Sequence, residues 1–364
     1  MRDNWTYKKW ADVLTIVNGK NQMAVECKDG EYPIYGSGGI MGYANNWLCP
    51  ENCVIIGRKG NINKPIFVTT KFWNVDTAFG LIANDNSLLS KFLFYFCQDY
   101  NFERHNKAVT IPSLTKADLL KIQIPLPPLS EQQSIVAELD KINELISLKK
   151  AQLKDLDALA QSIFYDMFGD PIENEKGWEV KKLGEIAIEK LSYGSGASAV
   201  EYDGETRYVR ITDITDGGEL DASIVSPNVF DNKYLLNDGD ILFARSGATV
   251  GKTFLYTPKY GRCIYAGYLI RYIPDKKVVL PLYVFALTKT TYYKSFISNS
   301  QRAVAQPNIN AKQYGDLQIP LPPLSLQQEF AKRIELIEQQ KAQISSTIKD
   351  LETLLASRMQ YWFD

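Results

Sequence analysis

The chain has 364 residues, a hydrophobic content of 45% and a formal net charge of −1, which predicts two or three globular units and gives no sign of nucleic-acid binding by the chain as a whole. No apolar run has the length of a membrane span and no signal peptide is present. The five cysteines include no CxxC pair, so we expect a cytoplasmic protein without a disulfide framework or structural zinc site.

The first predicted domain covers residues 1–124 and is mildly basic, with 14 Lys and Arg against 11 Asp and Glu. We expect a short helix over residues 9–17 and a later helix over residues 90–97. Between them lie a glycine-rich loop at residues 35–39 and an apolar strand followed by a turn at residues 55–60. Both are candidate contact loops, and a plain surface loop is the alternative for each.

A proline-rich phrase ends this domain and opens a long helix. Residues 124–130 read Ile-Pro-Leu-Pro-Pro-Leu-Ser. Because proline cannot enter a helix, they predict a stiff extended segment, after which Ser130 caps the helix with Gln133 as its capping-box partner. Apolar residues then recur in alternating steps of four and three, the heptad pattern of a coiled coil. The region 125–170 is acidic, and a straight helix from residue 131 to residue 168 would measure roughly 57 Å.

The second predicted domain covers residues 171–319. Runs of β-branched and aromatic residues predict its strands, and apolar periodicity predicts a helix near each end. The expected strands are 208–214, 240–244 and 264–273, and the expected helices are 182–191 and 282–296.

The phrase of residues 124–130 returns unchanged at residues 319–325, and the region 320–364 keeps the same heptad register. Seven identical residues followed by matching heptads indicate a duplication. The sequence therefore predicts an α+β chain in which two mixed α/β domains alternate with two long helices, as a pseudo-twofold internal repeat. The helices are expected to pair as an antiparallel coiled coil. Two unrelated amphipathic helices, each packed on its own domain, are the alternative.

Weaker repeats link the two domains. The matching segments are 5–10 with 178–183, 55–60 with 242–247, and 107–109 with 302–304. Because this frame persists while the loops differ, we expect one scaffold that reads two targets. The same repeat predicts that Met1 and Asp364 lie within ~17 Å of each other.

Residues 246–253 resemble a phosphate-binding loop, but Ser246 stands where that motif requires its first glycine. We interpret the segment as a turn that presents hydrogen-bond donors to a ligand, with Arg245, Thr249 and Lys252 as the candidate donors. A solvated surface loop is the alternative.

The sequence lacks the motifs of several catalytic classes. It contains no Asn/Asp-Pro-Pro-aromatic tetrapeptide and no adenosylmethionine loop, nothing completes a nuclease metal site around Glu26, and His105 is the single histidine. We therefore predict no catalytic residue and no metal ligand in this chain.

Together these features resemble the specificity subunit of type I restriction–modification enzymes. In that family two target-recognition domains alternate with two conserved helical regions, which open with a proline-rich phrase and a glutamine pair, as at Gln132 and Gln327 with the glutamines that follow them. A strand and loop like residues 240–252, DILFARSGATVGK, is also typical of its recognition domains. The resemblance covers nearly the whole chain, although the equivalent loop of the first domain, residues 57–64, is only partly similar.

The resemblance implies that the chain supplies sequence specificity to a complex that acts on DNA. Residues 1–124 and 171–319 would be the target-recognition domains, and residues 125–170 and 320–364 the conserved helical regions. The candidate DNA-binding residues are Tyr35, Ser37, Arg58, Lys59, Asn61, Lys64, Lys107, Arg245, Ser246, Thr249, Lys252 and Arg302.

The partners that the resemblance implies are a bipartite double-stranded DNA site and two adenine methyltransferase subunits. Whether two restriction–translocase subunits join is left open. S-adenosylmethionine, ATP and Mg are expected in the partner subunits, with no cofactor in this chain. A DNA-free scaffold that carries two protein-binding domains on a coiled-coil ruler is the main alternative, and an ATPase is a third.

Overall fold

The computed structural model covers the 364 residues and describes residues 5–106, 110–301 and 308–363. The chain forms two compact units: unit 1 is Met1–Ala151 with Ser345–Asp364, and unit 2 is Gln152–Ile344. Each unit therefore combines one globular domain with a segment of each long helix. None of the described helices has the length and hydropathy that a membrane span requires.

Unit 1 contains a small α/β domain. Its elements are β1 (Thr6–Lys9), α1 (Trp10–Val13), β2 (Leu14–Asn18), β3 (Tyr32–Gly36), β4 (Gly39–Ala44), β5 (Cys53–Gly57), β6 (Ile66–Val68), β7 (Trp73–Asn74), β8 (Ala78–Ala83), α2 (Ser90–Asp99), α3 (Lys116–Leu119) and β9 (Gln123–Leu126). The first long helix, α4 (Leu129–Phe168), begins in this unit and continues into unit 2.

Unit 2 contains the second α/β domain. Its elements are β10 (Glu179–Lys182), β11 (Ser192–Tyr193), β12 (Ala199–Glu201), β13 (Arg207–Val209), β14 (Val225–Pro227), β15 (Ile241–Ala244), β16 (Thr253–Leu255), β17 (Cys263–Tyr265), β18 (Leu269–Tyr272), α5 (Pro281–Leu287), α6 (Thr291–Gln301), α7 (Ala311–Gly315) and β19 (Gln318–Leu321). The second long helix is α8 (Leu324–Phe363).

The repeated proline phrase forms the same strand pair in both units. β1 pairs antiparallel with β9, and β10 pairs antiparallel with β19, with Thr6 opposite Leu126 and Glu179 opposite Leu321. These are isolated two-stranded ladders, which tolerate proline because no inner strand needs its missing N–H. The expected extended segment is thus confirmed, and it joins the first strand of each domain to the strand before each long helix.

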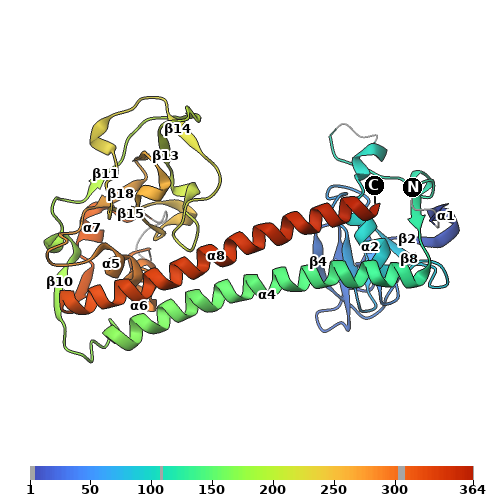
Figure 1. Ribbon diagram of the computed structural model, residues 1–364, viewed down its shortest axis with the longest axis horizontal. Coiled ribbons are helices and arrows are strands. Elements are labelled where there is room, and N and C mark those ends of the chain that lie inside the picture. The colour runs from blue at the N-terminus through green and yellow to red at the C-terminus, as the bar shows by residue number, and fades with distance from the viewer. Residues whose placement is uncertain (1–4, 107–109, 302–307, 364) are drawn as a thin grey trace. The chain divides into compact units, whose positions relative to one another are not determined.

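Each domain has a four-stranded antiparallel sheet with the same strand order. The order is β2-β8-β5-β6 in unit 1 and β11-β18-β15-β16 in unit 2. The inner strands β5 and β15 are buried along their whole length, as their apolar sequences require. In unit 1, α2 packs against this sheet (Figure 1). The duplicated frame predicted from the sequence is therefore present in the fold.

The remaining strands differ between the domains. Unit 1 adds a three-stranded sheet in the order β4-β3-β7, whereas unit 2 adds the pairs β12-β14 and β13-β17. The divergence lies outside the shared four-stranded sheet, so the two domains keep one scaffold while their peripheral strands vary.

Several predicted elements were wrong in extent. The expected helix at residues 9–17 stops at Val13, because the β-branched residues that follow pair with β8 as strand β2. The expected helix at residues 182–191 is only a 3₁₀ turn over Leu183–Ile186. The strand over 208–214 ends at Val209, and the predictions at 264–273 and 282–296 each split into two elements.

The helices α4 and α8 pair antiparallel within each unit. In unit 1, Glu138 bonds Arg358 and Lys150 bonds Glu352, so the partner number falls as the α4 number rises. Unit 2 repeats this direction from the Asp157–Lys341 ion pair to the contact of Phe168 with Phe330. The heptad positions of both helices are buried or half-buried, which confirms the predicted seam.

A buried glutamine fixes the start of each long helix. The amide of Gln132 donates to the carbonyl oxygens of Ser87 and Pro127, at 2.8 and 2.9 Å, and its oxygen accepts from the N–H of Leu89. Gln327 makes the equivalent bonds in unit 2, with the Leu280 N–H and the Pro322 carbonyl among its partners.

The expected cap was therefore misplaced. The first helix begins at Leu129, one residue before Ser130, and the glutamine that anchors its start is Gln132, whereas Gln133 is exposed. The physical reason is burial: the side chain of Gln132 is fully buried, and its amide bonds backbone groups of Ser87, Leu89 and Pro127.

Candidate nucleic-acid interface

An arginine follows the buried inner strand of each sheet at an equivalent place. Arg58 comes after β5 and Arg245 directly after β15. The carbonyl oxygen of Arg58 accepts from the N–H of Leu114, and that of Arg245 accepts from the N–H of Ile309, both at 2.9 Å. A rigid strand and a returning segment thus hold each arginine backbone in the same way, as the predicted match of residues 55–60 with 242–247 requires.

A glycine in the left-handed region turns the chain two residues after each arginine. Gly60 has φ 78° and Gly247 has φ 70°, conformations that favour glycine over any residue with a Cβ. A methyl group added at Gly247 would meet no atom of the described residues within 4 Å. The turn leaves room for a ligand to approach the main chain closely.

The guanidinium of Arg245 is oriented without being neutralised. It lies over the ring of Tyr193 at 4.7 Å, and its Nε donates to the Asn308 side-chain oxygen at 3.3 Å. Within the described part of the chain, no carboxylate lies within ion-pairing distance of this half-buried side chain. The arrangement preserves a positive charge in a fixed direction, which is what recognition of a phosphate or a guanine edge needs.

Arg58 is held differently in unit 1. Its Nη1 donates to the carbonyl oxygen of Asp76 at 3.3 Å, and its guanidinium lies 5.9 Å from the centre of the Phe79 ring. Asp76 lies just before β8 and Phe79 lies within it, so the aromatic support of Arg58 is on the strand next to β5, whereas Tyr193, which supports Arg245, is on β11, separated from β15 by β18.

The structure brings the glycine-rich hairpin of unit 1 beside the Arg58 turn. A methyl group at Gly60 would lie 3.8 Å from the hydroxyl of Ser37, and one at Gly38 would lie 3.6 Å from the amide nitrogen of Asn61. Ser37 and Asn61 therefore belong to one surface with Arg58, whereas the ring of Tyr35 packs edge-on against Phe72.

The other predicted contact residues lie in different surroundings. Lys59 and Lys64 are exposed, and Lys59 bridges to Ser113 through the backbone, as Ser246 bridges to Asn308. The hydroxyl of Thr249 donates to the carbonyl of Ser246 at 3.2 Å, which stabilises the turn itself. Lys107 and Arg302 lie outside the described residues.

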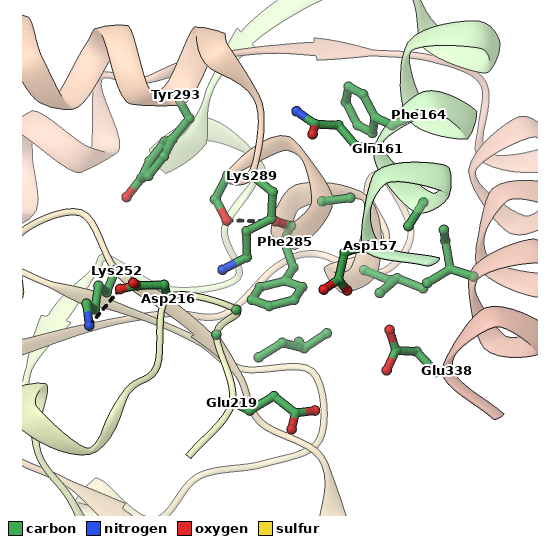
Figure 2. Close-up of a pocket in the computed structure, with 18 of the residues that line it drawn as sticks. Asp157, Gln161, Phe164, Asp216, Glu219, Lys252, Phe285, Lys289, Tyr293 and Glu338 are labelled. Carbon is green, nitrogen blue, oxygen red and sulfur yellow. Dashed lines mark hydrogen bonds and ion pairs between the residues drawn. The ribbon is translucent and has the colours of Figure 1, made fainter. Parts of the chain in front are cut away.

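Lys252 lines a cavity that Arg245 does not line. Its ammonium pairs with Asp216 at 2.9 Å (Figure 2) and donates to the carbonyl of Ile214 at 3.1 Å. Its predicted role in DNA contact has no support from this geometry and stays a prediction.

Neither Tyr193 nor Asn308 is among the predicted DNA-binding residues, although the glycine-rich loop that Tyr193 opens is a candidate for DNA contact from the sequence. Tyr193 belongs to a Tyr-Gly-Ser-Gly phrase that also occurs at Tyr35, but the two tyrosines lie on non-equivalent strands, β11 and β3. Asn308 comes beside Arg245 only through a strand-like bridge to Ser246. The tertiary pairing that creates this site leaves no local pattern in the sequence.

The described residues contain no group of three His, Cys, Asp or Glu side chains that could hold a metal ion. The described cysteines are free thiols, and burial raises the pKa of both Cys49 and Cys53 to about 12, so neither is a ready nucleophile.

Comparison with known proteins assigns this architecture to a family. The family described as "Type I restriction modification DNA specificity domain" matches residues 2–158 and 175–353. The chain belongs to this family.

Similar proteins carry the same description. The type I restriction enzyme MjaVIII specificity subunit of Methanocaldococcus jannaschii is 23% identical, over 97% of this chain and 92% of its own length. The EcoBI specificity subunit of Escherichia coli is also 23% identical, over 92% of this chain and 79% of its own length. The MjaIX specificity subunit of M. jannaschii is 28% identical, but the match spans 46% of this chain and 44% of that protein.

The fold is similar to a solved structure over the full chain. The type I restriction–modification S subunit of M. genitalium superposes with a TM-score of 0.61 at 17% identity, covering 99% of this chain and 96% of the other. At this identity the likeness concerns the fold, and it confirms the two domains and two long helices predicted from the sequence.

Proposed function

We propose that the chain is the DNA sequence-specificity subunit of a type I restriction–modification complex, in which each domain reads one half of a bipartite double-stranded DNA site. The observation that carries the proposal is the duplicated turn, in which Arg58 and Arg245 follow equivalent strands with the same backbone hydrogen bond. Membership in the specificity family supports the same reading.

The proposed division of labour gives this chain recognition and its partners the chemistry. Two adenine methyltransferase subunits would bind S-adenosylmethionine and flip the target adenine into their own pockets. ATP and Mg would belong to restriction–translocase subunits where these join. The chain itself would be a non-catalytic subunit that acts in the cytoplasm, where the DNA substrate lies.

Methylation mapping tests this function directly. The chain is expressed with its methyltransferase partner in a host without adenine methylation, and modified adenines are located by sequencing. A single motif with two specified halves and a fixed gap is expected. A continuous motif would contradict the split between domains.

The DNA-free scaffold predicts a different result. A scaffold would assemble with its partner but would give no sequence-specific methylation. It would also show no loss of DNA affinity with rising salt, whereas a DNA-binding subunit loses affinity steeply because phosphate contacts release counterions. A titration of the assembled complex at several salt concentrations separates the two functions.

A further inference from the structure

Unit 2 contains a cavity of about 1090 Å³ that the proposed DNA-binding function does not use. Its walls come from α5 and α6, the loop of residues 216–219, the turn of residues 248–252, and segments of α4 and α8 (Figure 2). Its volume lies slightly above the range typical of sites for small organic ligands, roughly 300–1,000 Å³.

One part of the cavity wall is apolar. Rings and aliphatic side chains from four helices meet here, and Figure 2 shows Phe164 of α4 and Phe285 of α5 on the wall. The apolar lining is formed by Phe164, Leu282, Phe285, Ile297, Phe330 and Ile334. Such a wall favours an apolar ligand body by removing it from water.

Most charges around the cavity neutralise one another. Lys252 pairs with Asp216 at 2.9 Å. Lys341 pairs with Asp157 and with Glu338, at 2.8 and 2.9 Å. These pairs leave little unsatisfied charge on their side of the cavity.

Lys289 is different. Its Nζ donates to the Thr253 hydroxyl at 3.2 Å and lies over the Phe285 ring at 4.5 Å. A methyl group at Gly218 would come within 2.6 Å of this nitrogen, so the loop covers it. Among the described residues no carboxylate lies within ion-pairing distance of its ammonium. Burial lowers the pKa of this lysine to about 8, although the nearby charge of Asp216, which pairs with Lys252, acts in the opposite direction.

A half-buried ammonium whose nearby carboxylate, Asp216, is ion-paired with another lysine is costly, and an anion that displaces water beside it recovers part of that cost. The groups already in contact with it are a hydroxyl and a phenyl ring, neither of which carries charge. One part of the wall is apolar, and the other charged groups described above are paired with one another. The ammonium of Lys289 and the apolar part of the wall together favour a ligand with one anionic group and an apolar body.

We propose that this cavity binds a small organic anion, with its acidic group on Lys289 and its apolar body against the ring of Phe285 and the adjoining wall. The proposal is independent of DNA binding. Because the walls include α5, α6, α4 and α8 segments of the same unit, a bound ligand would tie the second domain to the adjacent helix segments.

A pair of fluorescent probes tests the charge requirement. Anilinonaphthalene sulfonate has an aromatic body with one anionic group, and N-phenyl-1-naphthylamine has nearly the same body without it. We expect the full chain to bind the sulfonate at one saturable site, and Lys289→Met to weaken that binding roughly tenfold while the neutral probe is unaffected. Lys277→Met, at an exposed lysine outside the cavity, is the matched control.

The pH dependence of sulfonate binding is a second test of the role of Lys289. Sulfonate binding to the parent chain should weaken as pH rises through about 8, where Lys289 loses its proton. Lys289→Arg keeps its charge, so it should bind without that decline. Any decline that remains in Lys289→Arg would come from the other charged groups that face the site, which are Asp157, Asp216, Lys252, Lys294 and Glu338.

The proposal is overturned if Lys289→Met binds the sulfonate as tightly as the parent, or if the parent prefers the neutral probe. Circular dichroism and the melting temperature show whether Lys289→Met is folded. We expect it to be folded, since methionine keeps the stem and removes a desolvated charge. Should it fail to fold, the pH arm with Lys289→Arg decides: an unchanged decline in that variant also rejects the assignment.

Discussion

Arg245 and Arg58 stand at equivalent turns in domains that otherwise differ, so each should affect one half of the target. Arg245→Ala should relax one position of one half-site and cost roughly 1–3 kcal/mol if the side chain reads a base. If it holds a phosphate, all sequences should weaken alike. Methylation mapping of the assembled complex distinguishes these outcomes, and Arg58→Ala should act on the other half-site.

The matched control is Lys277→Ala. Lys277 follows β18, whose last residue pairs with Ile241, while its first residue pairs with Ala244 next to Arg245. The lysine therefore lies beyond the opposite end of the strand, and its loss should leave the motif and the affinity unchanged. An unaltered motif and affinity after Arg245→Ala would remove this residue from the interface.

The buried glutamines offer a second residue-scale test. Gln132→Leu and Gln327→Leu keep the side chain large but leave backbone groups, including the Leu89 and Leu280 N–H, without their partners. Each orphaned group costs about 1–3 kcal/mol, so both variants should unfold at lower urea concentration. The neighbours Gln133 and Gln328 are exposed, and the same change there should have little effect. Equal losses of stability at the buried and the exposed glutamines would contradict the proposed role of Gln132 and Gln327 in fixing the helix starts.

At the scale of elements, the pairing of α4 with α8 in unit 1 includes an ion pair that acid should break. Arg358 bonds both carboxylate oxygens of Glu138, and Trp362 bonds one of them. The hydrogen bond from Arg358 lowers the pKa of Glu138 below its ordinary value. A carboxylate with a depressed pKa stabilises the fold above its unfolded pKa, about 4.3, and the contribution is lost as pH falls through the folded pKa.

Glu138→Gln should therefore lower stability at neutral pH and flatten its decline below about pH 4.3. The measurement is the urea midpoint as a function of pH. Glu144→Gln is the control, because Glu144 is an exposed helix residue bonded only within its own turn to Lys141. If Glu138→Gln and the parent lose stability in parallel on acidification, the ion pair does not contribute.

Sequence reasoning succeeded for elements whose signals are local. Heptads define α4 and α8, prolines define the extended phrase, and the Arg-x-Gly spacing locates both turns. It failed where distant pairing decides: Leu14 begins a strand because β8 lies alongside it, and Lys252 faces a cavity because Asp216 attracts it. The support of Arg245 by Tyr193 is of the same kind, since the two residues come together only through the sheet.

At the scale of the whole molecule, both long helices pass from one unit into the other, and we propose that their length sets the gap in the DNA site. Inserting one heptad after Ala151 and one after Ile344 adds roughly 10 Å to each helix, about three base pairs of DNA. Methylation mapping should show a motif with the same halves and a longer gap. An insertion in α4 alone should break the register with α8 and abolish methylation. An unchanged gap in the variant with both insertions would reject the proposal that helix length sets the gap.

The two ends of the described chain lie together within unit 1. The rings of Trp5 and Trp362 stack with their centres 6.2 Å apart, although Met1 and Asp364, whose proximity the repeat predicts, lie outside the described residues. A short Gly-Ser linker should therefore join the termini, with a new start opened near Asn174. The permuted chain should keep its melting temperature and methylation motif. A start opened inside α4 should not, and loss of folding in both would mean that the ends cannot be joined.

The identical phrases at the ends of the two domains have a consequence for inheritance. Each copy pairs with the first strand of its own domain, and the two ladders have the same register, with Lys8 opposite Ile124 and Lys181 opposite Ile319. A genetic crossover within the stretch that encodes the phrase would join one domain to the other helix while preserving each ladder. Whole recognition halves could thus be exchanged at a joint that already fits, and a host lineage could acquire a new DNA specificity in a single recombination event.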